Sequence, residues 1–226
     1  MDKFKAAQMG ELLIAAYAKK SALEKDIELH HDIKGFSILT DLYVTAGELI
    51  KNNEWFGFIV EGDGAIVVVI PGTTSFYDWE NNADLTLIHK CIGGNCSVVK
   101  GVFDLVLQIE RVIFFELPAL RGKNKQIHIT GHSLGAAIAE NIFLRNGQIF
   151  DGECYSFASP KSRTQKFEID RLHRVYNRYD AVPRLPMNVP FIFELEHSGI
   201  EHELVWNFND VINNHAIGNY VDMVRR

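Results

Sequence analysis

The stretch QIHITGHSLGAAIAENIFLRNG, residues 126–147, decides the fold. Its first part, Gln126–Thr130, is rich in β-branched residues and predicts a short strand. Gly131 interrupts that pattern, and the run Leu134–Asn146 then has the apolar spacing of a helix, which Gly147 ends. The stretch therefore predicts a strand, a tight turn and a helix in immediate succession.

The turn in this stretch holds a serine between two glycines, Gly131-His132-Ser133-Leu134-Gly135. A turn this tight strains the serine backbone, and glycines on both sides keep the neighbouring backbone from clashing with it. Small alanines follow and allow the helix to lie close to the sheet. The context predicts a nucleophilic Ser133 exposed above the sheet, and the alternative is a structural Gly-Ser turn.

The rest of the chain alternates apolar strands with amphipathic helices and shows no repeat or linker. This alternation predicts one α/β domain over residues 1–226 with a mainly parallel sheet. Helices are expected over residues 2–20, from a Ser37 cap to Ile50, from Val102 to about Pro118, and from Ile217 to Val224. Strands are expected at 55–61, 65–70, 152–158, 171–177, 191–196 and 203–208.

Composition excludes several classes of protein. The 226 residues are 47% apolar and 23% charged, which is typical of globular chains and excludes disorder. With a net charge of −6, nucleic acid and anionic membranes are poor partners. The longest apolar run, Ala65–Ile70, is too short to span a bilayer. The N-terminus has no secretory pattern, so a cytoplasmic location is expected, with leaderless export or a trimmed chain left open.

The three cysteines and the clustered histidines predict neither a disulfide framework nor a metal site. An odd, small number of cysteines makes reduced thiols the default, although Cys91 and Cys96 could close a small loop. Cys154 lies in an apolar strand and is expected to be a buried thiol. Neither His30-His31-Asp32 nor His89 with the two loop cysteines has the spacing of a structural zinc site. We expect no metal and no cofactor.

A nucleophilic serine needs a base that is held by a third group, and after such a turn the chain order is serine, acid, histidine. Asp180 follows the expected strand 171–177, where open α/β sheets place their sites. His215 precedes the last helix. A turn aspartate and a surface histidine are the alternatives, and His202 is a rival base with a strand-like context.

The reaction of a serine with an ester also creates an oxyanion, which needs hydrogen-bond donors. One donor is expected to be the backbone N–H of Leu134. The other is expected from the loop after the buried strand Ala65–Ile70, where Gly72 permits close backbone approach and Thr73 offers an N–H and a hydroxyl. An ordinary Pro-Gly turn is the alternative.

Together these residues resemble the class 3 lipases, the fungal-type triacylglycerol lipase family of α/β-hydrolases, over roughly residues 50–225. The matching pieces come in the family's order: Gly72-Thr73, Asp78-Trp79, Asp84-Leu85, Lys100-Gly101-Val102, the serine turn, the block Asp180–Pro186, and His215 followed by Tyr220. The resemblance implies an α/β-hydrolase fold and a triad of Ser133, Asp180 and His215. It also implies Thr73 as an oxyanion residue. Pro71 replaces the family's usual arginine, so this loop must be braced differently.

The resemblance further implies a lid after Thr73, over about residues 75–88. Helical spacing would place Phe76, Trp79 and Ala83 on one narrow apolar face. We therefore expect modest interfacial activation and a preference for neutral lipid surfaces.

The sequence thus predicts a serine carboxylester hydrolase acting on acylglycerol or phospholipid esters, with a lipid or small ester as its substrate. An acyltransferase or thioesterase with the same triad, or a non-catalytic lipid-binding module, are the alternatives. The oligomeric state is left open.

Overall fold

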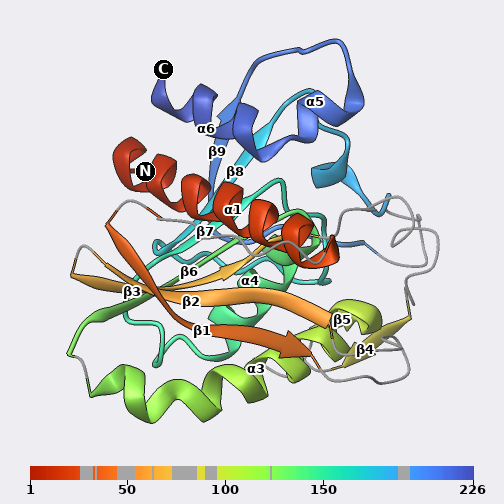
Figure 1. Cartoon of the computed structure of the whole chain (residues 1–226). Coiled ribbons are helices and arrows are strands. Elements are labelled where there is room, and N and C mark those ends of the chain that lie inside the picture. The colour runs from red at the N-terminus through yellow and green to blue at the C-terminus, as the bar shows by residue number, and fades with distance from the viewer. Residues whose placement is uncertain are drawn as a thin grey trace.

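A seven-stranded sheet forms the centre of the protein (Figure 1). The computed structural model describes residues 1–25, 33, 35–44, 54–62, 64–72, 86–89, 96–122, 124–187 and 194–226. The strands of the large sheet are β1 (Phe36–Val44), β2 (Glu54–Gly62), β3 (Ala65–Ile70), β6 (Gln126–His132), β7 (Cys154–Phe157), β8 (Leu172–Asn177) and β9 (Ile200–Leu204), in that spatial order. The short strands β4 (Leu87–His89) and β5 (Ser97–Val99) form a separate antiparallel pair.

The sheet is mixed, with a parallel part that carries the serine turn. β1, β2 and β3 pair antiparallel, whereas β3, β6, β7, β8 and β9 pair parallel. Because parallel neighbours end at the same edge, the loops after β3, β6, β7 and β8 meet at one edge of the sheet. Ser133 and Asp180 lie in two of these loops. The expected α/β class with a mainly parallel sheet is confirmed.

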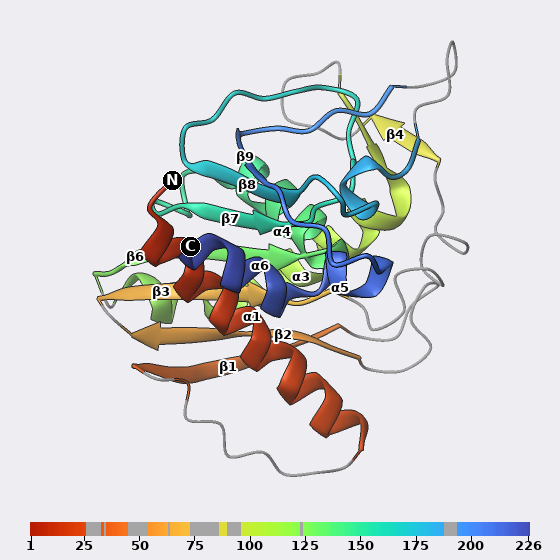
Figure 2. The same cartoon turned by 90° about the horizontal axis from the view of Figure 1, so that it is seen from above.

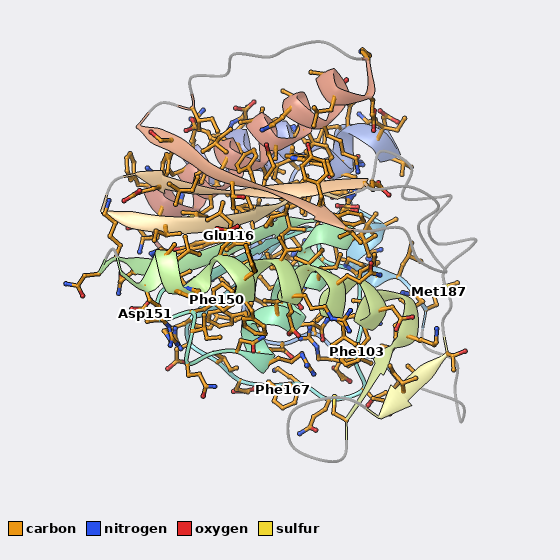
Figure 3. The ribbon with its side chains drawn as sticks, turned by 60° about the horizontal axis from the view of Figure 1, so that its bottom comes forward. Phe103, Glu116, Phe150, Asp151, Phe167 and Met187 are labelled. Carbon is orange, nitrogen blue, oxygen red and sulfur yellow. The ribbon has the colours of Figure 1, made fainter. Side chains whose placement is uncertain are left out.

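Helices cover both faces of the sheet. They are α1 (Lys3–Glu24), α3 (Lys100–Arg121), α4 (Leu134–Arg145), α5 (Val211–His215) and α6 (Ile217–Arg225). Figures 1 and 2 show α1 and α6 side by side over one face, with α3 and α4 on the other. Figure 3 views the molecule from the α3 side, where Phe103 and Glu116 project from that helix.

Strand β3 explains why the sheet needs a helix layer on each side. All of Ile66–Ile70 is buried. Ile66, Val68 and Ile70 belong to the core beneath α3 and α4, whereas Val67 and Val69 belong to the core beneath α1 and α6. A strand that is apolar on both faces can be buried only when both faces are covered.

Three of the expected secondary-structure elements differ from the structure. The helix expected from Ser37 to Ile50 is wrong, because Phe36–Val44 forms the edge strand β1. The pairing of this strand with β2 overrides the helical spacing of its apolar residues. Residues 45–50 lie outside the described residues. The last strand is Ile200–Leu204 rather than 203–208. Of the strand expected at 191–196, only 194–196 are described, and there Glu196 makes one isolated bridge to Arg163.

The cysteines divide into two kinds. Cys154 is free and fully buried on β7, as expected. Cys96 is disulfide-bonded, which corrects the expectation of a reduced thiol there, and its partner lies outside the described residues. Among the helices that the structure describes, none is long and apolar enough to cross a membrane.

Candidate active site

Ser133 occupies the sharp turn between β6 and α4. Its backbone has φ 58° and ψ −130°, a left-handed conformation that is costly for a residue with a side chain. The turn is held because the Ser133 N–H donates to the Phe157 carbonyl of β7 at 3.0 Å, while the Ser133 carbonyl accepts from Ala136 of α4 at 2.9 Å. The strand before it and the helix after it therefore fix the strained conformation that the sequence predicts.

The two glycines of the turn are required by space. A Cβ on Gly131 would lie 2.3 Å from the Gly135 carbonyl oxygen. One on Gly135 would lie 2.2 Å from the Ile70 carbonyl oxygen at the end of β3. In both places the obstacle is backbone, which cannot rotate away. Only glycine lets α4 leave the sheet at this angle.

The hydroxyl of Ser133 is buried rather than exposed as the sequence predicts, and it has no hydrogen-bond partner among the described residues. Buried hydroxyls usually have a partner, so an exception needs a reason. A hydroxyl kept for reaction with a ligand is one such reason.

Asp180 and His215 meet at the carboxyl edge of the sheet. The Nδ1 of His215 lies 2.7 Å from Oδ2 of Asp180. The same Oδ2 accepts from the Tyr220 hydroxyl at 2.8 Å, and Oδ1 accepts from the Val182 N–H at 3.0 Å. Burial, and then the charge of Asp180, raise the pKa of Tyr220, so its phenol stays protonated and donates. The carboxylate is thus fixed by three donors, one of them the histidine ring.

The segment carrying His215 is anchored by asparagines. The side-chain amide of Asn177, at the end of β8, donates to the Trp206 and Asn214 carbonyls at 3.0 and 3.4 Å. Asp210 caps α5 by accepting from the N–H groups of Ile212 and Asn213. These contacts hold the last residue of α5, His215, next to the loop after β8.

His132, the residue before Ser133, links the turn to His215. Its Nε2 lies 2.9 Å from the His215 carbonyl oxygen, and the two rings are 4.7 Å apart between centroids. Burial, and then the nearby charge of His215, lower the pKa of His132 well below its usual value. The ring is therefore neutral, and because Nε2 faces a carbonyl it must carry the proton.

The other nitrogen of His132 receives a hydrogen bond from helix α1. Its Nδ1 lies 2.8 Å from the Tyr17 hydroxyl, which donates because Nδ1 has no proton. The same hydroxyl oxygen accepts from the Gly72 N–H at 2.8 Å, in the loop after β3. A Cβ on Gly72 would lie 2.6 Å from that hydroxyl and 2.8 Å from Ser133 Cβ. Tyr17 thus braces the loop in which Pro71 replaces the arginine of the resembled family.

This arrangement has the parts of nucleophilic catalysis. A carboxylate orients an imidazole, and an imidazole held in this way can exchange a proton with a hydroxyl. The serine sits at the N-terminus of α4, where the first backbone N–H groups have no acceptor within the helix. Such groups stabilise a developing negative charge.

Comparison with known families decides the assignment. Residues 67–189, more than half of the chain, match the family described as Lipase (class 3). The chain belongs to the class 3 lipases. It is accordingly a carboxylic ester hydrolase that uses a serine triad.

Solved structures of fungal lipases have the same fold. A triacylglyceride lipase of Rhizomucor miehei is 18% identical, with 90% of this chain and 81% of that chain covered at a TM-score of 0.66. A triacylglycerol lipase of Penicillium expansum is 22% identical, with coverages of 88% and 80% and a TM-score of 0.65. At these identities the likeness shows the fold alone. A search of curated proteins finds no match.

The structure places the residues that the sequence singled out for the triad as follows. Ser133 lies in the turn after β6, and Asp180, in the loop after β8, contacts His215 at the end of α5. The rival base His202 lies on β9, where its ring contacts His173 at 3.2 Å. Leu134 begins α4, whereas Thr73, Phe76, Trp79 and most of the segment 75–88 lie outside the described residues. The end of that segment, from Leu87, is strand β4.

Sequence reasoning missed the roles of Tyr17 and His132. Tyr17 sits in the apolar stripe of α1, so its spacing is that of a core aromatic residue. No signal marks its hydroxyl, because its two partners are 55 and 115 residues away. Within the described part of the chain, no group of three or more His, Cys, Asp or Glu side chains could hold a metal ion.

Proposed function

We propose that Ser133, His215 and Asp180 are the nucleophile, base and acid of a lipase that hydrolyses acylglycerol esters. Two observations carry the assignment: the 2.7 Å contact of His215 with Asp180, and a serine with a strained backbone whose buried hydroxyl has no partner among the described residues. The family match supports the class of reaction.

In the proposed reaction, Ser133 Oγ attacks the ester carbonyl carbon while His215 Nε2 takes the hydroxyl proton. His215 then donates this proton to the leaving alcohol, and the C–O bond to that alcohol breaks. Asp180 holds Nδ1 in the correct tautomer and stabilises the imidazolium. Water, deprotonated by the same histidine, then attacks the acyl carbon. The bond to Ser133 Oγ breaks, His215 returns the proton to Oγ, and the fatty acid leaves.

The oxyanion of both tetrahedral intermediates is assigned to two donors. The Leu134 N–H is in the first turn of α4 and follows the nucleophile directly, as the mechanism requires. Thr73 follows Gly72, whose backbone lies against Ser133 Cβ. We propose Thr73 as the second donor because of this adjacency.

Exposed apolar side chains around the triad loops support a lipid substrate. Met187 is 75% exposed and Ile212 is 73% exposed, in the segments that follow Asp180 and precede His215. Figure 3 shows Met187 at the rim of the molecule. Such side chains favour contact with an apolar, uncharged surface such as an acylglycerol droplet.

The test is release of fatty acid from emulsified tributyrin and from phosphatidylcholine, with Ser133→Ala as the control. We expect turnover on tributyrin that Ser133→Ala abolishes. Faster turnover on phosphatidylcholine would replace the acylglycerol assignment with a phospholipase. Acyl transfer to an added alcohol with no release of free acid would identify an acyltransferase.

A further inference from the structure

Tyr220 of α6 donates to the same carboxylate oxygen that holds the proposed base. Asp180 Oδ2 lies 2.8 Å from the Tyr220 hydroxyl and 2.7 Å from His215 Nδ1. A carboxylate oxygen has about two lone-pair sites, so these two donors use the accepting capacity of Oδ2. The other oxygen, Oδ1, accepts from the Val182 N–H at 3.0 Å. The tyrosine and the histidine therefore share the negative charge of one oxygen atom.

The direction of the Tyr220 hydrogen bond is fixed by a backbone donor. The Tyr220 oxygen accepts from the N–H of Asn177, the last residue of β8, at 2.9 Å. An N–H can only donate, so the hydroxyl proton of Tyr220 is directed to Asp180. Burial, and then the charge of Asp180, raise the pKa of Tyr220 well above its usual value, so this proton stays on the phenol. Tyr220 is thus a permanent donor to the carboxylate.

The ring of Tyr220 is held by the core between α6 and the sheet. The side chain is fully buried in the cluster beneath α1 and α6. Its ring packs edge-on against Phe157 at 6.4 Å between centroids and against His132 at 6.2 Å. The Phe157 carbonyl also holds the Ser133 N–H. The hydroxyl therefore reaches Asp180 from a fixed position beside the serine turn.

We propose that Tyr220 is a positioning residue of the triad, which keeps Asp180 Oδ2 facing His215 and limits how strongly that oxygen attracts the imidazolium. This role rests on the proposed function, because it needs His215 to be the base. A donor to an anion offsets part of its charge. Without the Tyr220 hydroxyl, Asp180 would hold the imidazolium more tightly, and His215 would release its proton only at a higher pH.

Other charged and titratable groups surround this pair and stay in place when only the Tyr220 hydroxyl is removed. The neutral ring of His132 lies 4.7 Å from that of His215 between centroids. A small cavity beside Asp180 is lined by the cations and the histidine Lys161, Arg174, Arg184 and His197. Tyr220→Phe leaves all of these side chains unchanged, so it isolates the effect of one hydrogen bond on the pair.

The first measurement is an NMR titration of the His215 ring in the Ser133→Ala chain, with and without Tyr220→Phe. The Ser133→Ala background removes turnover, so the titration does not depend on whether the protein hydrolyses an ester. We expect Tyr220→Phe to move the midpoint of the His215 titration to higher pH by about 0.5–1 unit, which is part of what a hydrogen bond to a charged group contributes. An unchanged midpoint, or a midpoint at lower pH, would overturn the proposal.

Two controls place this effect at the contact with Asp180. Tyr155→Phe removes another fully buried tyrosine hydroxyl that donates to a carboxylate, that of Glu153 just before β7, and it should leave the His215 midpoint unchanged. In an Asp180→Asn background, Tyr220→Phe should have little further effect, because its acceptor no longer carries a charge. An equal shift in Tyr155→Phe, or an undiminished one in the Asp180→Asn background, would contradict the proposal. Circular dichroism and melting verify that each variant is folded.

Kinetics on a soluble p-nitrophenyl ester then test the role of Tyr220 in the reaction. The acidic limb of the kcat/KM profile should move to higher pH in parallel with the titration, which lowers kcat/KM on that limb by about three- to tenfold. A uniform loss of kcat/KM with an unmoved limb would indicate a purely structural role and overturn the proposal. If the wild type hydrolyses no ester while the midpoint shifts as expected, the proposed function fails and the action of Tyr220 on the Asp180–His215 pair stands.

Discussion

The Tyr17 hydroxyl lies 2.8 Å from His132 Nδ1 and joins the first helix of the chain to the residue beside the nucleophile. This hydroxyl also accepts from the Gly72 N–H in the loop after β3, and His132 in turn donates to the His215 carbonyl. Hydrogen bonds therefore join Gly72, Tyr17, His132 and His215 in series. All the donors in this series point in one direction, from Gly72 to His215. Tyr17 therefore positions two loops of the active site relative to each other without touching the reacting atoms.

Replacing Tyr17 with phenylalanine should lower kcat by about tenfold or more. The ring still fills its place, but Gly72 and His132 each lose a partner, and an unsatisfied buried group costs about 1–3 kcal/mol. The measurement is kcat and KM on a soluble p-nitrophenyl ester together with the melting temperature. Tyr43→Phe, at an exposed tyrosine of β1, is the matched control. A wild-type kcat in Tyr17→Phe would exclude the positioning role.

The Asp180–His215 pair predicts which histidine is the base. Asp180→Asn and His215→Ala should each reduce kcat by about 10⁴. Asp180→Asn removes the carboxylate that orients the imidazole, and His215→Ala removes the imidazole itself. His202→Ala should leave kcat near wild type, because His202 lies on β9 and contacts His173 of β8 rather than Asp180. If the His202 variant were inactive and the His215 variant active, the base would be misassigned.

The buried pair of Glu140 and Arg163 predicts a large effect on stability. Their side chains are 2% and 1% exposed, and Arg163 Nη2 lies 3.1 Å from Glu140 Oε2, while Oε1 accepts from the Ser156 hydroxyl. Glu140→Ala leaves a buried cation without its partner and should lower the free energy of unfolding by about 3–5 kcal/mol. Urea denaturation measures this. Glu203→Ala, which breaks the exposed pair with Arg178, should have a much smaller effect, because solvent screens an exposed ion pair. Similar losses in both variants would refute the role of burial.

His202 predicts a dependence of stability on pH. Burial, and then the positive N-terminal amine, lower the pKa of His202 from 6.5 to about 4. Between these values the unfolded chain binds more protons than the folded one, so stability falls as pH decreases from 6.5 toward 4. His202→Gln should make that fall shallower by at most about 1 kcal/mol per pH unit, because solvent screens the partly exposed ring. Unfolding curves with the same pH slope in both proteins would show that His202 does not contribute.

The elements that the sequence predicted well are those whose local pattern agrees with their environment. The sharp turn around Ser133 is predictable because only glycine fits beside the backbone at positions 131 and 135. Strand β3 is predictable because it is apolar on both faces, each of which a helix layer covers. Asp180 and His215 were identified because strand ends and helix starts mark the edge of a parallel sheet. Strand β1 was predicted as a helix because its apolar residues also fit helical spacing, and only pairing with β2 decides between the two.

The parts of the site that could not be predicted depend on contacts between distant segments. Tyr17 and Gly72 are 55 residues apart, and the tautomer of His132 is fixed by Tyr17 on one side and by the His215 backbone on the other. A small cavity beside Asp180 likewise collects residues from β8 and from the loops before and after it. The residue pattern around each of these positions does not indicate such contacts, because each residue also fits its own helix, strand or loop without them.

The central claim is that Ser133 is the nucleophile, and labelling with a fluorophosphonate followed by intact-mass and peptide analysis tests it most directly. The phosphonate phosphorus is attacked by the activated hydroxyl and fluoride leaves, so one adduct per chain should form on Ser133 in the wild type. His215→Ala should label far more slowly, and Ser133→Ala should not label at all while keeping its melting temperature. An unlabelled wild type, or an adduct on another residue that persists in Ser133→Ala, would contradict the account.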